Sequence, residues 1–237
     1  MNPKTSSLFL FLIILSLIDA VLALSVGFSY RYNASSMIEA CLGAALLFLI
    51  AGGLWFYRRR SKTRGNSLAL QQAIVIGMIL GLLWMVEIGI NNFIAPPLPA
   101  RDIIDNLFWI VIALSILIFA VLQAYQTGSI VHGIEVGTWS GFVSGMLACC
   151  MALVMVVFGM RFIMQDPLNI AEWAGQQAVS PAPGMAAYFA FETFAGALGH
   201  LTILGIGMGA LLGGAAGMLG VGGRRLSQRV RGLHQNR

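Results

Sequence analysis

Charged residues are scarce in this chain: Asp, Glu, Lys and Arg together make up 10% of its 237 residues. A soluble globular domain carries roughly a quarter of its residues as charges, so the composition excludes an ordinary soluble domain. Apolar residues supply 58% of the chain instead. They gather in long runs, and each run reaches the roughly 20 residues that a helix needs to cross a bilayer core. These runs lie near 7–29, 37–57, 69–94, 103–124, 136–161 and 186–220.

The apolar runs are continuous and do not alternate with polar residues as the strands of a membrane barrel do. Because hydrocarbon offers no water to backbone polar groups, continuous spans must satisfy those groups as helices. The sequence therefore predicts an all-α integral membrane protein, one bundle of about six transmembrane helices over residues 1–237, with a basic tail at 221–237. The first run also fits a cleaved secretory signal. We expect it to be retained, because it continues past Asp19 to about Ser29 without an A-x-A site.

Basic residues are distributed unevenly between the two predicted sides. With runs that alternate in direction, only Arg31, Arg101 and Arg161 of the 14 Lys and Arg residues fall on one side. The positive-inside rule then predicts cytoplasmic termini and a location in the plasma (inner) membrane of a bacterium. The basic segments at 58–64 and 224–237 predict contacts with anionic lipid head groups. No basic patch is interleaved with aromatic residues, so we expect no nucleic acid partner.

Motifs for metal, nucleotide or covalent chemistry are missing. The three cysteines lie inside apolar runs, and neither the isolated Cys41 nor the adjacent Cys149 and Cys150 have metal-ligand or redox-pair spacing. The chain has no H-E-x-x-H, P-loop or dinucleotide fingerprint. We therefore expect no cofactor, no metal site and no enzymatic activity. The two halves of the chain also share no glycine, proline or charge pattern, so the inverted repeat of many transporters is not recognisable.

Glycine, in contrast, is abundant, with 28 residues. Residues four apart share a helix face, and small residues let helix backbones approach closely in lipid. With the predicted directions, two such glycine stripes lie in the cytoplasmic half of the fifth and sixth spans. We predict that they pair as antiparallel helices, with a dimer contact as the alternative, and that leucine is worse at Gly141 or Gly209 than at Gly27. The stripes are Gly133, Gly137, Gly141 and Gly145, and Gly205, Gly209, Gly213 and Gly217.

Ionisable residues inside spans are candidates for a functional site, because a buried charge is costly in a bilayer. Glu87 and Glu192 lie at a similar predicted depth in the outer third, His200 lies about two turns deeper than Glu192, and Asp19 lies mid-span. With Arg161 near the outer surface, these five residues form the predicted polar site, in which we expect Glu192 to matter most. The alternatives are structural: a Glu192–Arg161 ion pair, or an Asp19–His200 pair.

Connecting segments carry clearer local signals. Residues 166–177 predict a short helix at the membrane surface, capped by Asp166 and begun by Pro167. Three prolines within 96–99 exclude helix there, and Asp102 and Asp105 supply negative charge to the next helix start. We assign His132 and Glu135 to a cytoplasmic loop.

Two functions fit these features. Transport of a small solute or ion, as a permease or part of one, is favoured by the outer carboxylates and the missing catalytic motifs. The alternative is a non-transporting membrane scaffold or subunit, in which the glycine stripes contact a second copy or a partner subunit. A membrane-embedded enzyme comes third. A cavity beside Glu87 and Glu192 favours transport, and carboxylates on an exposed rim favour the scaffold.

Overall fold

The computed structural model describes residues 3–60 and 68–235, and within them the chain is helical almost throughout, with no strand. Six helices are long and apolar enough to cross a membrane, which confirms the predicted all-α class and the number of spans. The elements are α1 (Pro3–Tyr30), α2 (Ala34–Arg60), α3 (Leu68–Gly89), η1 (Ile90–Ile94), α4 (Ala100–Thr127), α5 (Ile130–Gln165), α6 (Pro167–Gln176), α7 (Met185–Gly199), η2 (His200–Met208) and α8 (Gly209–Gln235); η1 and η2 are π-helical.

The surface of the bundle is apolar. Leu49, Phe158 and Ile203 are 74%, 75% and 68% exposed, and many other large apolar side chains are exposed as well. Soluble monomers rarely expose continuous apolar surface on this scale, whereas lipid accommodates it. The exposed apolar side chains and the long apolar helices therefore both indicate a helical bundle that lies in a bilayer.

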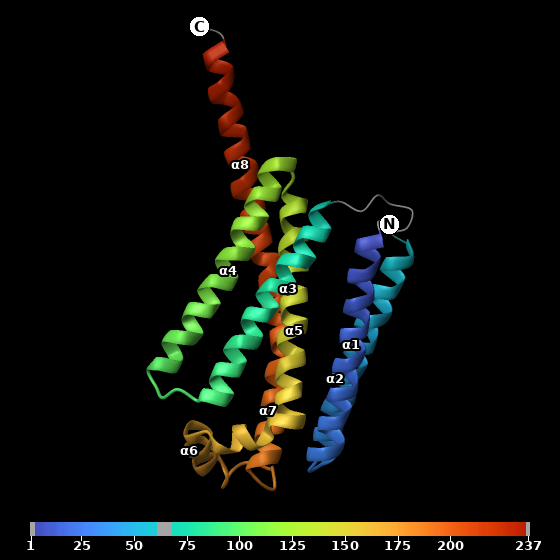
Figure 1. Cartoon of the computed structure of the whole chain (residues 1–237), viewed down its shortest axis with the longest axis vertical. Helices are drawn as coiled ribbons and strands as arrows, with labels where there is room; N and C mark the ends of the chain where they lie inside the picture. Colours follow the sequence, from blue (N-terminus) through green and yellow to red (C-terminus); the bar gives the residue numbers. More distant parts are fainter. Residues whose placement is uncertain (1–2, 61–67, 236–237) are drawn as a thin grey trace.

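The bundle has two distinct ends (Figure 1). One end, here called the basic end, holds the N-terminus, the end of α2, the start of α3, the α4–α5 connection and the C-terminal part of α8. The other, the α6 end, holds the α1–α2 turn, the α3–α4 connection and α6. The sixth span runs through α7, η2 and α8 as 47 residues, Met185–Arg231, or about 70 Å of helix. This length carries the end of α8 well beyond its neighbours (Figure 1).

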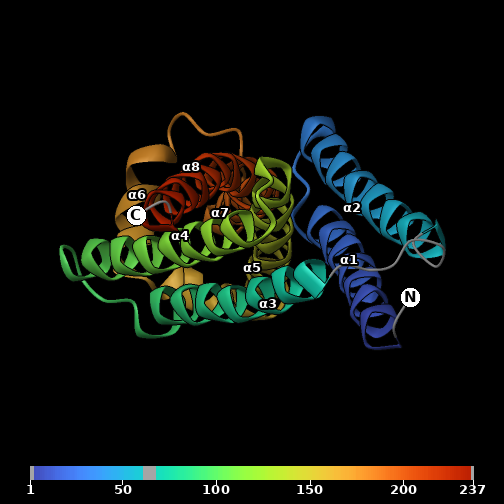
Figure 2. The same ribbon diagram turned by 90° about the horizontal axis from the view of Figure 1, so that it is seen from above.

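Helix α5 is the centre of the fold. It packs against α3, against η2 and α8, and against α1 and α7, and most of its side chains from Gly133 to Ile163 are buried. The α1–α2 pair lies to one side of the other helices (Figure 2). The main core fills the space between this pair, α5 and α7, with Phe9, Leu12, Leu47, Met146 and Phe194 among its fully buried side chains.

The two glycine stripes lie against each other. A Cβ added to Gly133 would stand 2.8 Å from both the carbonyl oxygen of Gly213 and the Cα of Gly217. A Cβ added to Gly141 would meet the carbonyl oxygen of Gly205 even more closely. These distances leave no room for side chains, so α5 meets η2 and α8 backbone against backbone. The glycine surface is therefore occupied within the chain.

Other glycines differ sharply in their surroundings. A Cβ on Gly77 of α3 would stand 2.6 Å from the carbonyl oxygen of Ser140 on α5, so α3 is also held closely. Gly27 is not an open position either, because a Cβ there would lie 2.5 Å from the Ala40 Cβ of α2. Gly27 is therefore also a close contact, and the expected difference between leucine at Gly141 or Gly209 and leucine at Gly27 stays a prediction. Gly52 has nothing within 4 Å of an added Cβ and is the better reference.

Local signals in the connections are largely reproduced. Asp166 accepts a hydrogen bond of 3.0 Å from the backbone N–H of Leu168, and Pro167 is the first residue of α6. Helix α4 begins at Ala100, directly after the prolines. The loop assignment of His132 and Glu135 was wrong, because α5 already begins at Ile130. Gly128 lies in the short turn between α4 and α5 and has a left-handed φ of 72°, which glycine adopts without strain.

Candidate polar site between α3 and α4

The five predicted site residues do not form one cluster. Asp19 is fully buried on α1, beside the Cys150 thiol of α5. Neither of its carboxyl oxygens has a well-formed hydrogen bond to the described residues. His200 lies elsewhere, with its ring edge-on to Trp84 at a centroid distance of 4.6 Å and its Nδ1 2.8 Å from the carbonyl oxygen of Gly196. The alternative Asp19–His200 pair is therefore not formed.

Glu192 and Arg161 also lie apart. Glu192 is exposed on α7, and its charged neighbour is Glu172 of α6, which accepts a hydrogen bond of 2.9 Å from the Tyr188 hydroxyl. The Arg161 guanidinium lies 4.6 Å from the centroid of the Phe162 ring. Within the described residues the ion pair that forms is Arg101–Asp166 at 2.7 Å, so the Glu192–Arg161 alternative was wrong.

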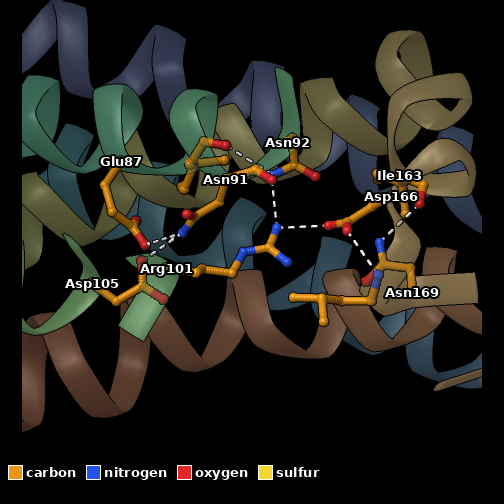
Figure 3. Close-up of polar contacts among 10 residues, drawn as sticks. Glu87, Asn91, Asn92, Arg101, Asp105, Ile163, Asp166 and Asn169 are labelled. Carbon is orange, nitrogen blue, oxygen red and sulfur yellow. Dashed lines mark hydrogen bonds and ion pairs between the residues drawn. The ribbon is translucent and has the colours of Figure 1, made fainter. Parts of the chain in front are cut away.

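Glu87 is the predicted residue that joins a polar cluster (Figure 3). The Asn91 side-chain amide lies between two carboxylates, donating to Glu87 Oε1 at 2.8 Å and to Asp105 Oδ1 at 2.7 Å. Arg101 donates to the backbone oxygen of Asn91 and pairs with Asp166. We call these five residues the α6-end cluster. It contains three carboxylates and one guanidinium, so negative charge is in excess.

The backbone around the prolines brings this cluster together. Helix α3 continues into η1, which contains Asn91, and the chain returns through residues 95–99 to start α4 at Ala100. Arg101 in the first turn of α4 therefore faces the end of η1, and Asp105 lies one turn further on. Asp102 remains in the first turn as expected, but Asp105 contacts Asn91 and not only its own helix end. Asp166 has two partners, the N-terminus of α6 and Arg101.

An aromatic group lies one turn deeper. Trp84 precedes Glu87 by three residues on α3, and Trp109 follows Asp105 by four on α4, so each indole shares a helix face with one of the carboxylates. The two indole rings are 5.0 Å apart, and the His200 ring meets Trp84. Trp84 is only 5% exposed, and its Nε1 has no hydrogen-bond partner in the described part of the chain. The residue with this unpaired donor lies about one turn from Glu87 along α3.

The middle of the contact between α3 and α4 is apolar. Five buried residues pack together there, and Leu204 of η2 and Leu212 of α8 pack against them. We call them the middle apolar cluster: Leu80, Trp84, Ile112, Ile116 and Ala148. No more than 5% of any of these side chains is exposed.

At the basic end the contact becomes polar again around a cavity of about 440 Å³. Gln123 of α4 donates a hydrogen bond of 3.0 Å to Gln72 of α3, and the Nδ1 atom of His132 is buried without a partner among the described residues. We call the space between these residues the amide cavity. Its lining residues are Leu68, Ala69, Gln72, Phe119, Leu122, Gln123, Gln126, Thr127 and His132. Sequence reasoning missed this cavity because it weighed charges alone. Glutamines at matching depths in two consecutive spans were the available signal.

The α3–α4 seam, backed by α5 and η2, therefore has polar side chains at both ends and an apolar middle. Its helices pack more extensively on α5 and α8 than on each other. Comparison with known proteins gives no match to a protein-family model, to a curated protein or to a solved structure.

Proposed function

We propose that this protein transports a small cation across the membrane along the α3–α4 seam. The observation that carries the proposal is the order of groups along the seam: the α6-end cluster, the middle apolar cluster and the amide cavity. Polar residues inside a membrane bundle mark solute pathways, and apolar constrictions act as gates that exclude water. The seam combines both features between the same pair of helices.

The chemistry of the α6-end cluster favours a cation. Glu87 and Asp105 share a single amide donor, Asn91, and the Oδ1 atom of Asn91 is buried without a hydrogen-bond partner among the described residues. The side-chain oxygens of three residues thus lie in one cluster with excess negative charge, and rings of carboxylates and carbonyl oxygens are what cation pathways use. The indole faces of Trp84 and Trp109 suit an organic cation as well as a metal ion.

The Leu204 side chain is our candidate for the moving part. It belongs to the π-helical segment η2, and π-helical turns are frequent at functional sites. Leu204 packs against the middle apolar cluster. A change of its rotamer would shift Leu204 relative to Ile112 and Ile116, while the η2 backbone stays against α5 at Gly141. In this mechanism, side-chain motion opens and closes the apolar middle of the seam.

We further propose that the basic end faces the cytoplasm of a bacterial cell and the α6 end faces outside. The positive-inside rule supports this orientation, because Arg58, Arg59 and Arg60 end α2 at the basic end. Under it, the cation meets the α6-end cluster first from outside and leaves through the amide cavity.

The competing scaffold role finds less support. It relied on the glycine stripes as a surface for a partner, and those stripes contact each other between α5 and α8. A partner subunit would need another surface. Neither the amide cavity nor the apolar pocket described below is lined by Glu87 or Glu192. Glu87 accepts a hydrogen bond within the α6-end cluster, whereas Glu192 is exposed, so we transfer the main functional role from Glu192 to Glu87.

Potassium flux into proteoliposomes tests the proposal. The full-length protein is reconstituted, and K⁺ entry is followed with an enclosed fluorescent indicator. Glu87→Gln removes one of the negative charges and should lower the flux about tenfold, the effect of losing about 1.4 kcal/mol of cation binding. Glu192→Gln makes the same chemical change outside the seam and should leave the flux unchanged. Equal fluxes in both variants, or a wild-type flux no higher than that of empty liposomes, would contradict the proposal.

A further inference from the structure

A second cavity lies on the opposite side of α5, between α5 and the basic end of α2. It has a volume of about 290 Å³. The side-chain hydroxyls among its lining residues are those of Tyr57 and Thr138. The Thr138 hydroxyl donates a hydrogen bond to the backbone oxygen of Ile134. The remaining wall is apolar. The lining residues are Ile50, Gly53, Leu54, Tyr57, Thr138, Trp139, Phe142 and Ile206.

The cavity exists because α2 leaves the bundle toward its basic end. Near the α6 end α2 is held closely, since a Cβ on Gly43 would lie 2.9 Å from Leu198 of α7. About two turns before the end of α2, Gly52 and Gly53 have nothing within 4 Å of an added Cβ. Figure 2 shows the same divergence, with the later part of α2 directed away from α5. The space between them opens in the region that lipid surrounds.

Three arginines follow the cavity-lining residues of α2 along the helix. The α2 residues in its wall recur every three or four positions, at Ile50, Leu54 and Tyr57, and the same helix face reaches Arg60 three residues later. Arg58 donates to the Ser6 hydroxyl of α1 at 2.9 Å, and the Arg59 guanidinium lies 3.8 Å from the centroid of the Trp55 ring. The Arg60 guanidinium lies 4.4 Å from the centroid of the Phe56 ring, so the three arginines are held by contacts around the end of α2, beyond the cavity.

The size of the cavity distinguishes between apolar occupants. Two turns of a helix about 10 Å across fill about 850 Å³, about three times the volume of this cavity, so a partner helix could place only some of its side chains there. A single acyl chain is narrow enough and is present wherever the cavity meets the bilayer. Clustered Lys and Arg beside a membrane end attract anionic head groups, whereas zwitterionic head groups have no net charge to attract.

We propose that this cavity is a binding site for an anionic phospholipid, with one acyl chain between α2 and α5 and the head-group phosphate at Arg58, Arg59 and Arg60. The bound chain covers Trp139, whose ring is 5.6 Å from that of Phe9 and 5.7 Å from that of Tyr57. It therefore adds to the ring contacts through which Trp139 joins the α1–α2 pair to α5. This site is independent of cation transport along the α3–α4 seam.

The glycines of α2 offer a matched pair of variants. Gly53→Leu places a side chain in the wall of the cavity, and Gly52→Leu makes the same change one residue earlier, outside the wall. Neither added side chain meets another atom within 4 Å at its Cβ, so both variants should fold. A third variant, Arg59→Gln/Arg60→Gln, leaves the cavity open and removes two positive charges.

The experiment measures lipid retention by the full-length protein in detergent, using native mass spectrometry with dioleoyl phosphatidylglycerol or dioleoyl phosphatidylcholine. We expect the wild type and Gly52→Leu to retain one phosphatidylglycerol, with a preference over phosphatidylcholine of about tenfold or more. Gly53→Leu should lose this retention while keeping the lipid-free unfolding temperature of Gly52→Leu. The double arginine variant keeps Arg58 and should show a clearly smaller preference for phosphatidylglycerol than the wild type.

Two results would overturn the proposal. Unchanged phosphatidylglycerol retention in Gly53→Leu would show that the lipid binds outside the cavity. Equal retention of both lipids by the wild type would show that the arginines do not select the head group. If Gly53→Leu unfolds at a lower temperature than Gly52→Leu without lipid, the double arginine variant alone decides the outcome, because its cavity is unaltered.

Discussion

The α5–α8 interface and the α3–α4 seam join helices in opposite ways. Between α5 and α8 the glycines bring backbone against backbone, so that an added Cβ at Gly137 or Gly213 would meet a carbonyl oxygen. Between α3 and α4, long side chains meet through hydrogen bonds at the two ends and through an apolar cluster in the middle. The first interface has no space for a solute. The second has polar groups, a cavity and side chains that can change position.

The energetics follow from these contacts. Close backbone packing adds many van der Waals contacts of about 0.1–0.2 kcal/mol each, and a rigid backbone has no rotamer through which to lose them. A side-chain hydrogen bond between membrane helices stabilises by about 0.6 kcal/mol on average. The α5–α8 interface is therefore the fixed part of the molecule, and the α3–α4 seam is the part that can open at modest cost.

The largest expected effect comes from filling the glycine interface. Gly141→Leu should lower the free energy of unfolding by about 3 kcal/mol, the upper range for overpacking, because the new side chain meets the Gly205 carbonyl and no rotamer relieves the contact. Unfolding in mixed detergent, followed by circular dichroism, measures the loss. Gly52→Leu is the control and should be neutral or slightly stabilising, since leucine favours helix over glycine. Equal stability of the two variants would remove the distinction between fixed and mobile interfaces.

A smaller effect is expected at the α6 end of the seam. Arg101→Gln leaves the buried Asp166 carboxylate without its ion-pair partner and should cost about 2 kcal/mol. The cost stays below that of a fully buried pair because the Arg101 side chain is 16% exposed. Asp166→Asn keeps the cap of α6, as Asn caps equally well. The double variant should therefore be more stable than the sum of the two single losses implies, and strict additivity in thermal unfolding would argue against the ion pair.

The smallest effect on stability is expected at the amide cavity. Gln72→Leu removes the acceptor of the Gln123 amide and should cost about 0.6 kcal/mol. Adding Gln123→Leu removes the unsatisfied partner and should restore part of that stability. Potassium flux should nevertheless fall in both variants, because the cavity loses the polar groups that line the path. If the potassium flux recovers together with the stability in the double variant, the two glutamines have a structural role only.

Hydropathy and spacing predicted the parts of the fold that depend on neighbouring residues along the chain. Long apolar runs gave the six spans, an Asp–Pro pair gave the start of α6, and glycines four apart marked one helix face. Each of these signals depends on a local physical cause: desolvation of the backbone, an unsatisfied helix N-terminus, or the helical repeat. All of them are visible without knowing which helices become neighbours.

The candidate site depends on which helices pack against each other, and the sequence alone did not predict those contacts. Glu87 and Glu192 share a predicted depth, but depth does not say which side of the bundle a helix face meets. Glu87 meets Asn91 and Asp105, while Glu192 is exposed beside Glu172. Gln72, Gln123 and Gln126 carry no charge and were not weighed. The π-helical segments also lack a recognisable sequence signature, although one contains Asn91 and the other begins at His200.

The central claim is that the α3–α4 seam is reached by water from both sides and stays dry in the middle. Single cysteines placed along α4 test this claim most directly, in a background without Cys41, Cys149 and Cys150. The reagent is a membrane-impermeant maleimide, which reacts with the thiolate and therefore needs a hydrated site. The open positions Gly175 and Gly222, with no atom near an added Cβ, report the proposed outer side and the proposed cytoplasmic side.

We expect Asp105→Cys to react from the same side as Gly175→Cys, and Gln123→Cys from the same side as Gly222→Cys. Ile112→Cys, in the middle apolar cluster, should react from neither side. Reaction of Gly175→Cys and Gly222→Cys from one side only would reject the six-span orientation. With those two positions on opposite sides, protection of both Asp105→Cys and Gln123→Cys would show a seam closed to water at both ends, and the account of α3 and α4 as a cation path would be wrong.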